Sequence, residues 1–351
     1  MINKLETKLL SITSLKFKCL LIIIVAIRVG VSPIGKEWFG WLLEASKAFP
    51  DATSYISYSP IPVLILKLLR TSNPYVWWLL WLLIDIAWIF FCFKLIEKRY
   101  PSSARALQLI FIMSQSVMVN LTMIGHYDNL IFIAGSMLLF YEKKSIYFLS
   151  AVIVGGANPY LGFASGVCFI FYYFFSGKKK HLDISLAWLL SNFVYLVGTH
   201  LWYVAPATGT RESIVLGQVG EVIKGSIGVW WFIPLTILGP LTLIYAAIIY
   251  ENLNQTQSKS MLRIFSLILA TFLIPTAMAY LILDHTRIGV AAGGVVSLLF
   301  IFENFEKITE KANMFEIPLL TTLFVIWILT PPLIIDSGGV FRLPYLKYIQ
   351  L

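Results

Sequence analysis

The sequence predicts an all-α bundle of helices embedded in a membrane. Of the 351 residues, 58% are hydrophobic and 13% are charged, whereas soluble domains carry about 25% charged residues. The mean hydropathy is +0.81. Apolar stretches of about 17–25 residues recur from end to end, the length that a helix needs to cross a hydrocarbon core of about 30 Å. We therefore expect a polytopic transmembrane bundle of about eleven spans, forming a single domain over residues 1–351.

The order of apolar runs and basic clusters predicts where each span lies. With the N-terminus in the cytoplasm, 17 of the 27 Lys and Arg residues fall on the cytoplasmic side, nine fall on the outer side and Arg28 falls within a span. This excess agrees with the positive-inside rule. The expected spans are residues 19–34, 76–95, 105–124, 129–141, 146–157, 160–176, 184–204, 229–250, 262–283, 288–303 and 316–335.

The first apolar run, the cysteines and the net charge argue against a signal peptide, a disulfide or zinc site, and a nucleic-acid partner, respectively. The run from Cys19 to Ile34 contains Arg28 and lacks a small-residue cleavage site, so we expect a retained helix rather than a removable signal peptide. The three cysteines lie in apolar segments without metal-ligand spacing and indicate neither a disulfide framework nor a zinc site. The charge of +9 is distributed in short clusters between spans. That distribution argues against nucleic acid as a partner.

Two segments depart from simple spans. Residues 145–176 join two basic cytoplasmic clusters and contain the sequence GGANPYLG, where Pro159 must break a helix. We expect a pair of short helices that meet near Asn158 on the outer side. In the first outer loop, the sequence IPVLILKLLR is typical of an interfacial helix lying on the membrane surface, with Lys67 and Arg70 toward the headgroups.

The predicted topology gathers polar side chains on the outer face. Polar groups in or at the rim of a bilayer are costly and often mark a site. Those expected there are Asp51, His126, Asp128, Asn158, Asp284, His285 and Arg287.

Each of these residues also has a purely structural explanation. Asp51 could be a solvated loop residue, and loop polarity alone could account for His126 and Asp128. In the sequence LDHTRIG, an ion pair between Asp284 and Arg287 could cap a helix end.

Two ionisable residues fall within predicted spans. Arg28 lies deep in the first span, although its long side chain could extend toward the outer interface. Asp85 lies near the middle of the second, and we expect it to make a buried polar or ionic contact with another helix rather than to carry chemistry.

The outer residues suit chemistry on a lipid-linked phosphate. No phosphate-binding glycine loop, His-Glu-x-x-His or Gly-x-Ser-x-Gly sequence is present. Arg287 could pair with a lipid phosphate at the outer interface, and Asp51 could deprotonate an acceptor hydroxyl as it attacks a sugar's anomeric carbon. Tyr55 and Tyr127 could line a sugar site, although aromatic belts at membrane interfaces predict the same residue types.

The order of these features resembles the GT-C superfamily of multi-span glycosyltransferases. The resemblance covers about residues 20–176, with the other spans at 184–335, and rests on AIRVGVSP, PDATSYISYSPIPVLILKLL, LLIDIAW and GHYDNLIFIAGSMLLF. It implies a sugar donor carried on polyprenyl or dolichyl phosphate, used on the non-cytoplasmic side. Asp51 matches the family's first-loop acidic residue, its usual candidate base, and Asp128 matches the acidic position of the second outer turn.

These inferences combine into one expected function with two alternatives. We expect transfer of a sugar from a polyprenyl-phosphate donor to a glycan or glycolipid acceptor, at the outer face of a bacterial cytoplasmic membrane. Asp51 would be the base, Asp128 and His126 would orient substrate, and Arg287 with His285 would hold phosphate; Asp284, Asn158, Tyr55, Tyr127 and Arg28 complete the expected substrate-binding set. No cofactor is expected, and the single aspartate at position 51 does not indicate a metal. The alternatives are an O-antigen-type polysaccharide polymerase and a non-enzymatic flippase or transporter of lipid-linked sugars.

Overall fold

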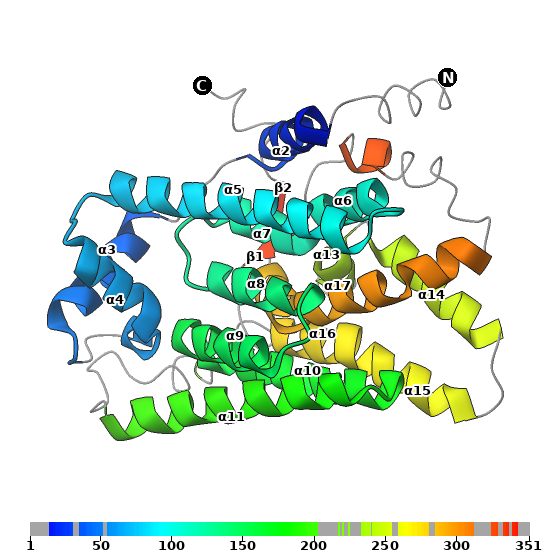
Figure 1. Cartoon of the computed structure of the whole chain (residues 1–351). Coiled ribbons are helices and arrows are strands. Elements are labelled where there is room, and N and C mark those ends of the chain that lie inside the picture. The colour runs from blue at the N-terminus through cyan, green and yellow to red at the C-terminus, as the bar shows by residue number, and fades with distance from the viewer. Residues whose placement is uncertain are drawn as a thin grey trace.

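The chain forms a nearly all-helical bundle in a computed structural model (Figure 1). The structure describes residues 14–30, 35–51, 55–202, 217, 220, 224, 233–239, 241–254, 259–280, 285–311, 324–328, 333–336 and 339–342. Its helices up to the middle of the chain are α2 (Ser14–Val29), α3 (Lys36–Ala48), η1 (Tyr55–Tyr58), α4 (Pro60–Leu69), α5 (Pro74–Arg99), α6 (Ala104–Met113), α7 (Gln115–Thr122), α8 (Asn129–Ser136), η2 (Met137–Leu139), α9 (Lys144–Ala157), α10 (Pro159–Ser176) and α11 (Lys179–Trp202).

The second half continues in helices and adds one small hairpin. The helices are α13 (Ile233–Leu238), α14 (Leu241–Asn254), α15 (Lys259–Ile268), the π-turn η3 (Leu269–Leu273), α16 (Ile274–Tyr280) and α17 (His285–Lys311). Strands β1 (Leu333–Asp336) and β2 (Gly339–Arg342) pair antiparallel, with Leu333 opposite Arg342. Most of the predicted last span, 316–335, lies outside the described residues, and its final residues belong to β1 rather than to a helix.

Membrane spanning is supported, but the expected number of spans is not confirmed. Five helices among the described residues are long and apolar enough to cross a bilayer, or six if the bent pair α6 and α7 is one span. That pair bends by 49°, at Ser114, whose side chain caps α7 by accepting from the amide of Val117. The predicted span 229–250 is likewise divided between α13 and α14, and α9 has only 14 residues. It is therefore about 21 Å long, short of a full crossing.

Helix α17 is the centre of the bundle (Figure 1). Nearly all of its apolar segment Arg287–Phe305 is buried, and it packs against α7, α8, α10, α13 and α16. The hydroxyl of Ser165 in α10 donates to the carbonyl of Ala291 in α17, at 2.9 Å. A buried helix of this kind must be apolar on every side, which the sequence VAAGGVVSLLFIF satisfies.

The α9–α10 hairpin forms where the sequence predicts it, with Asn158 between the two helices. Small residues let α10 approach α11: a methyl group added at Gly162 or Gly166 would collide with Asn192 or Leu189. Close backbone approach through small residues is typical of helix packing in membranes.

Helices α3 and α4 differ from the others in direction, because they lie across one end of the bundle, at the left in Figure 1. In α4, Leu68 and Leu69 are exposed while Val63 and Leu66 are buried. The sequence predicts a helix here and the structure has one, but apolar side chains lie on both its buried and its exposed sides. Its placement on the membrane surface therefore stays a prediction.

Candidate functional site

The turn between α7 and α8 carries His126, Tyr127 and Asp128. The turn begins at Gly125, whose φ of +89° is a conformation that side chains with a Cβ rarely adopt. The indole Nε1 of Trp77 donates to the carbonyl of Gly125 at 3.1 Å, and a Cβ at this position would lie 2.8 Å from that nitrogen. Glycine therefore sets the direction in which the next three side chains leave the backbone.

Four polar side chains from three separate regions of the chain meet at this turn. We call His126, Asp128, Asn158 and Arg287 the Asp128 cluster. Asn158 donates to Asp128 Oδ1 at 2.7 Å, and Arg287 Nη1 donates to Asp128 Oδ2. Asp128 is fully buried and Arg287 is 8% exposed. A buried charge needs a partner, and here the carboxylate and the guanidinium neutralise each other.

The imidazole of His126 lies against Arg287. Arg287 Nη1 is 3.2 Å from Nδ1 and 3.0 Å from Nε2. An atom this close to both ring nitrogens lies over the ring face, since it cannot lie in the ring plane along both lone pairs. Nδ1 also accepts from the backbone amide of Asp128, at 3.2 Å.

Two aromatic rings complete the surroundings of His126. The Tyr127 ring centroid is 4.2 Å from that of His126, and the ring of Trp38, from α3, is 4.9 Å from His126 and 5.5 Å from Tyr127. Trp38 is half-buried. It therefore covers the cluster from the end of the bundle that α3 crosses.

The helices also bring a positive potential to the cluster. Asp128 and Asn158 are the N-cap residues of α8 and α10, and Arg287 is the third residue of α17. Each helix N-terminus carries about half a positive charge. The charges of Asp128 and Arg287 cancel each other. The partial charges of the three helix ends therefore favour an anion at this site.

The remaining predicted site residues lie elsewhere or outside the described side chains. Asp51 is exposed and follows the C-terminal end of α3. Trp38 lies near the other end of that helix, about 15 Å away along its axis, so the structure does not bring Asp51 to the cluster. Arg28 lies over the ring of Trp327, 4.2 Å from its centroid. Asp284 and the side chains of Tyr55 and His285 lie outside the described part.

A second buried polar group lies directly behind the turn. We call Asp85, Asn120 and Asn129 the Asp85 group; all three are fully buried. Asn120 and Asn129 each donate to the Asp85 carboxylate, at 3.4 Å, so Asp85 makes the contact between helices that the sequence predicts. Sequence reasoning missed Trp38, Asn120 and Asn129. Only Asn129 could have been suspected from the sequence, because it directly follows Asp128.

Charged residues also meet at the opposite ends of the same helices. Glu303 of α17 contacts Lys178, Lys180 and His181, at 2.9, 2.6 and 3.1 Å respectively. Arg287 and Glu303 are 16 residues apart in α17, which is about 24 Å along the axis. The two polar ends of this helix are thus separated by nearly the thickness of a hydrocarbon core.

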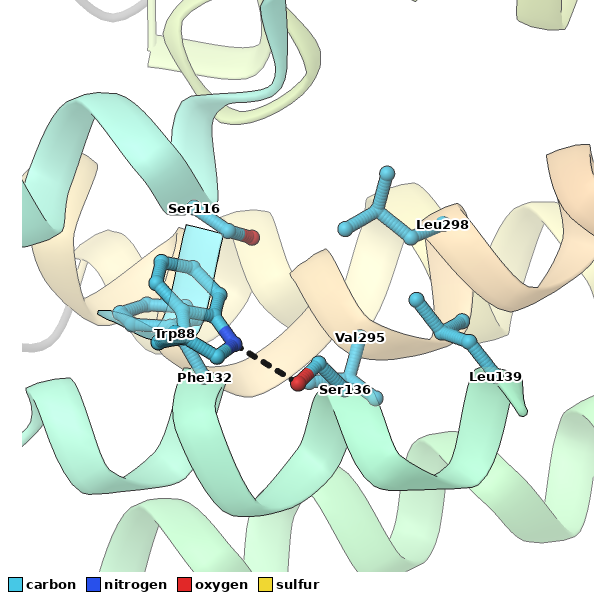
Figure 2. A pocket seen from close by; sticks show the side chains of 7 residues that line it. All are labelled: Trp88, Ser116, Phe132, Ser136, Leu139, Val295 and Leu298. Carbon is cyan, nitrogen blue, oxygen red and sulfur yellow. Dashed lines mark hydrogen bonds between the residues drawn. The ribbon is translucent and has the colours of Figure 1, made fainter. Parts of the chain in front are cut away.

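A small cavity between α5, α7, α8 and α17 is mostly apolar (Figure 2). Trp88 and Ser136 both line this cavity, and the indole of Trp88 donates to Ser136 Oγ at 2.8 Å. The cavity has few other polar groups. Its volume is about 10 Å³, room for at most one water molecule. This cavity is therefore too small for a sugar.

Neither a metal site nor a similarity to known proteins identifies the functional class of this protein. Among the described residues, no three His, Cys, Asp or Glu side chains are grouped as metal ligands would be. No family model, curated protein or solved structure matches the chain. Fold and site together define a nearly all-helical protein that has five helices, among the described residues, able to cross a membrane and a buried polar cluster at one end of its bundle.

Proposed function

We propose that the protein is a membrane glycosyltransferase that takes a sugar from a polyprenyl-phosphate carrier and passes it to a lipid-linked or surface glycan. One observation carries the proposal: three helix N-termini and Arg287 converge on His126 and Asp128 at the end of the bundle that α3 covers. This arrangement favours an anionic group that sits at a membrane interface. A lipid phosphate has both properties.

The geometry suggests how the cluster would take part. Arg287 would pair with the donor phosphate, because guanidinium binds phosphate through paired hydrogen bonds. Asp128 already accepts from both Arg287 and Asn158, so it would hold these groups in place rather than abstract a proton. The rings of Trp38, His126 and Tyr127 offer flat faces beside the anion site, where a sugar could stack.

The transfer itself would be a displacement at the anomeric carbon. The acceptor oxygen forms the new bond to that carbon, the bond to the phosphate oxygen breaks, and the lipid phosphate leaves with the electron pair. A base takes the acceptor's proton. Asp51 remains the proposed base, and to act it must approach the cluster together with the segment that follows α3.

Mass spectrometry of cellular glycans and lipid-linked intermediates tests the proposal. Cells lacking the gene would be complemented with wild type, Arg287→Lys, Asp128→Asn or Asp51→Asn, and Asp183→Asn would serve as a control carboxylate from the half-buried surface of α11. Wild type and the control should restore the glycan, whereas the other three should accumulate its lipid-linked precursor. Product length would separate a polymerase from a transferase of single sugars. Full transfer by folded, purified Asp51→Asn and Arg287→Ala would refute the assignment.

Transport of a lipid-linked sugar is the second candidate, and a specific observation favours it. Broken helices and charges within the span are typical of transporter sites. Here α6 and α7 meet at a 49° bend, and α15 continues into α16 through the π-turn η3. Reconstituted protein that moves a lipid-linked sugar between leaflets without changing it would favour this function.

A further inference from the structure

The structure assigns a binding site for one monovalent cation, H⁺ or Na⁺, to the Asp85 group. This inference does not depend on the proposed transferase activity. Asp85 is the twelfth of 26 residues in α5, so about 16 Å of helix precedes it and about 21 Å follows it. The carboxyl group therefore lies in the middle third of a helix that is long enough to span a bilayer.

No cationic side chain among the described residues contacts Asp85. Among the described residues, only two neutral amides contact the carboxylate: Asn120 Nδ2 at Oδ1 and Asn129 Nδ2 at Oδ2. Both distances are 3.4 Å, longer than ordinary hydrogen bonds. By contrast, Asp128 forms an ion pair with the guanidinium of Arg287. A lone charge in the middle of a membrane protein is costly, and a bound cation removes that cost.

Two backbone oxygens lie beside the Asn129 amide that contacts Asp85. Asn129 Nδ2 lies 3.3 Å from the carbonyl oxygens of both Asn120 and Met123, and Met123 is the C-cap residue of α7. The side-chain oxygens of Asn120 and Asn129 are buried without a donor in the described structure. Amide rotation would turn these oxygens toward Asp85, giving carboxylate, amide and carbonyl ligands from a helix end, the set that transporters use for Na⁺ or H⁺. One carboxylate balances one positive charge, so the ion is monovalent.

Two measurements on the purified full-length protein in nanodiscs test the site and identify the ion. The first is the midpoint of thermal unfolding, in NaCl against choline chloride at equal ionic strength, and across pH in choline chloride alone. The second is the infrared spectrum, in which a protonated carboxyl and a carboxylate absorb at different frequencies. Wild type, Asp85→Asn and the control Asp183→Asn are compared.

Two results would support the site, and each names a different ion. If Na⁺ binds, Na⁺ raises the wild-type midpoint to a plateau and shifts a carboxylate band, and both effects disappear in Asp85→Asn. If a proton binds, wild type shows a protonated carboxyl band that Asp85→Asn lacks, and Na⁺ has no specific effect. In either case Asp183→Asn behaves as wild type.

A different set of results would overturn the proposed cation site. An Asp85 that stays ionised, together with equal Na⁺ and pH responses in wild type and Asp85→Asn, would overturn the assignment. If Asp85→Asn does not fold, Asn120→Asp replaces it. That substitution places a second carboxylate beside the first, so the dependence of the midpoint on cation or proton concentration should become steeper. An unchanged dependence would overturn the inference.

Discussion

At the scale of single residues, Gly125 has the most consequence for the candidate site. Its positive φ and its contact with Trp77 fix the backbone immediately before His126. The side chains of His126 and Asp128 then reach Arg287, which is 159 residues from Asp128 along the chain. A small change at position 125 should therefore disturb contacts that involve residues far away in sequence.

We predict that Gly125→Ala destabilises the protein by about 1–3 kcal/mol, the typical cost of a strained backbone conformation. The added methyl group also meets the Trp77 indole at 2.8 Å. Denaturant unfolding in detergent micelles measures the effect. The matched control is Gly198→Ala in the exposed part of α11, where nothing lies within 4 Å of the added Cβ. It should be neutral or stabilising by about 0.5–1 kcal/mol. Equal effects of the two substitutions would contradict the role given to Gly125.

At the scale of elements, ion pairs link the end of the bundle away from the Asp128 cluster. Glu142, in the connection between η2 and α9, contacts Lys180 of α11 and Arg99 of α5, each at 2.8 Å. The hydrogen bond from Lys180 is the main reason that the pKa of Glu142 is lowered from its ordinary value, and Arg99 contributes as well. In its ionised form, Glu142 thus joins α5 and α11 to the connection between η2 and α9.

This lowered pKa makes the contact dependent on pH. A carboxyl whose pKa is lower in the folded state stabilises the protein above its unfolded value, about 4.3, and the contribution is lost as pH falls through the folded value. We expect the stability difference between wild type and Glu142→Gln to be constant near neutral pH and to shrink below about pH 4. Thermal unfolding across pH measures it. Lys143→Gln, which changes a neighbouring exposed lysine, should retain the wild-type pH profile; a profile that matched Glu142→Gln instead would contradict this explanation.

At the scale of the whole molecule, two sets of charged groups lie at the two ends of shared helices, apart from the Asp85 group. The Asp128 cluster lies at the N-terminal ends of α8, α10 and α17. Lys178, Lys180 and Glu303 gather near the C-terminal ends of α10 and α17. Between the two sets the side chains are mostly apolar, and the Asp85 group is the buried exception. This distribution is the one that a bilayer requires, and it suggests that the two sets face opposite sides of the membrane.

We predict that the ends of α5 are labelled from opposite sides of the membrane. Ser72→Cys, just before α5, should react with a membrane-impermeant maleimide added to intact cells, and Ser102→Cys, just after α5, should react only after permeabilisation. Both positions are exposed. Wild type is the control for background labelling, since Cys92 and Cys168 are buried and Cys19 is partly buried. Labelling of both variants in intact cells would contradict a spanning α5, and the reverse pattern would invert the expected orientation.

The sequence by itself determined the local features, because hydrophobic runs, proline and helix caps act over a few residues. These features include the helical bundle, the break at Asn158, the short helix α4 and a buried contact for Asp85. The tertiary structure decided which polar residues meet. Asn158 is 30 residues from Asp128 and Arg287 is 159 residues away, so only the packing of α8, α10 and α17 brings them together. The same packing leaves Asp51 at the far end of α3 and places Trp38 over the cluster. No local pattern distinguishes these two outcomes, because both residues lie in the outer segment that the sequence predicts between the first two spans.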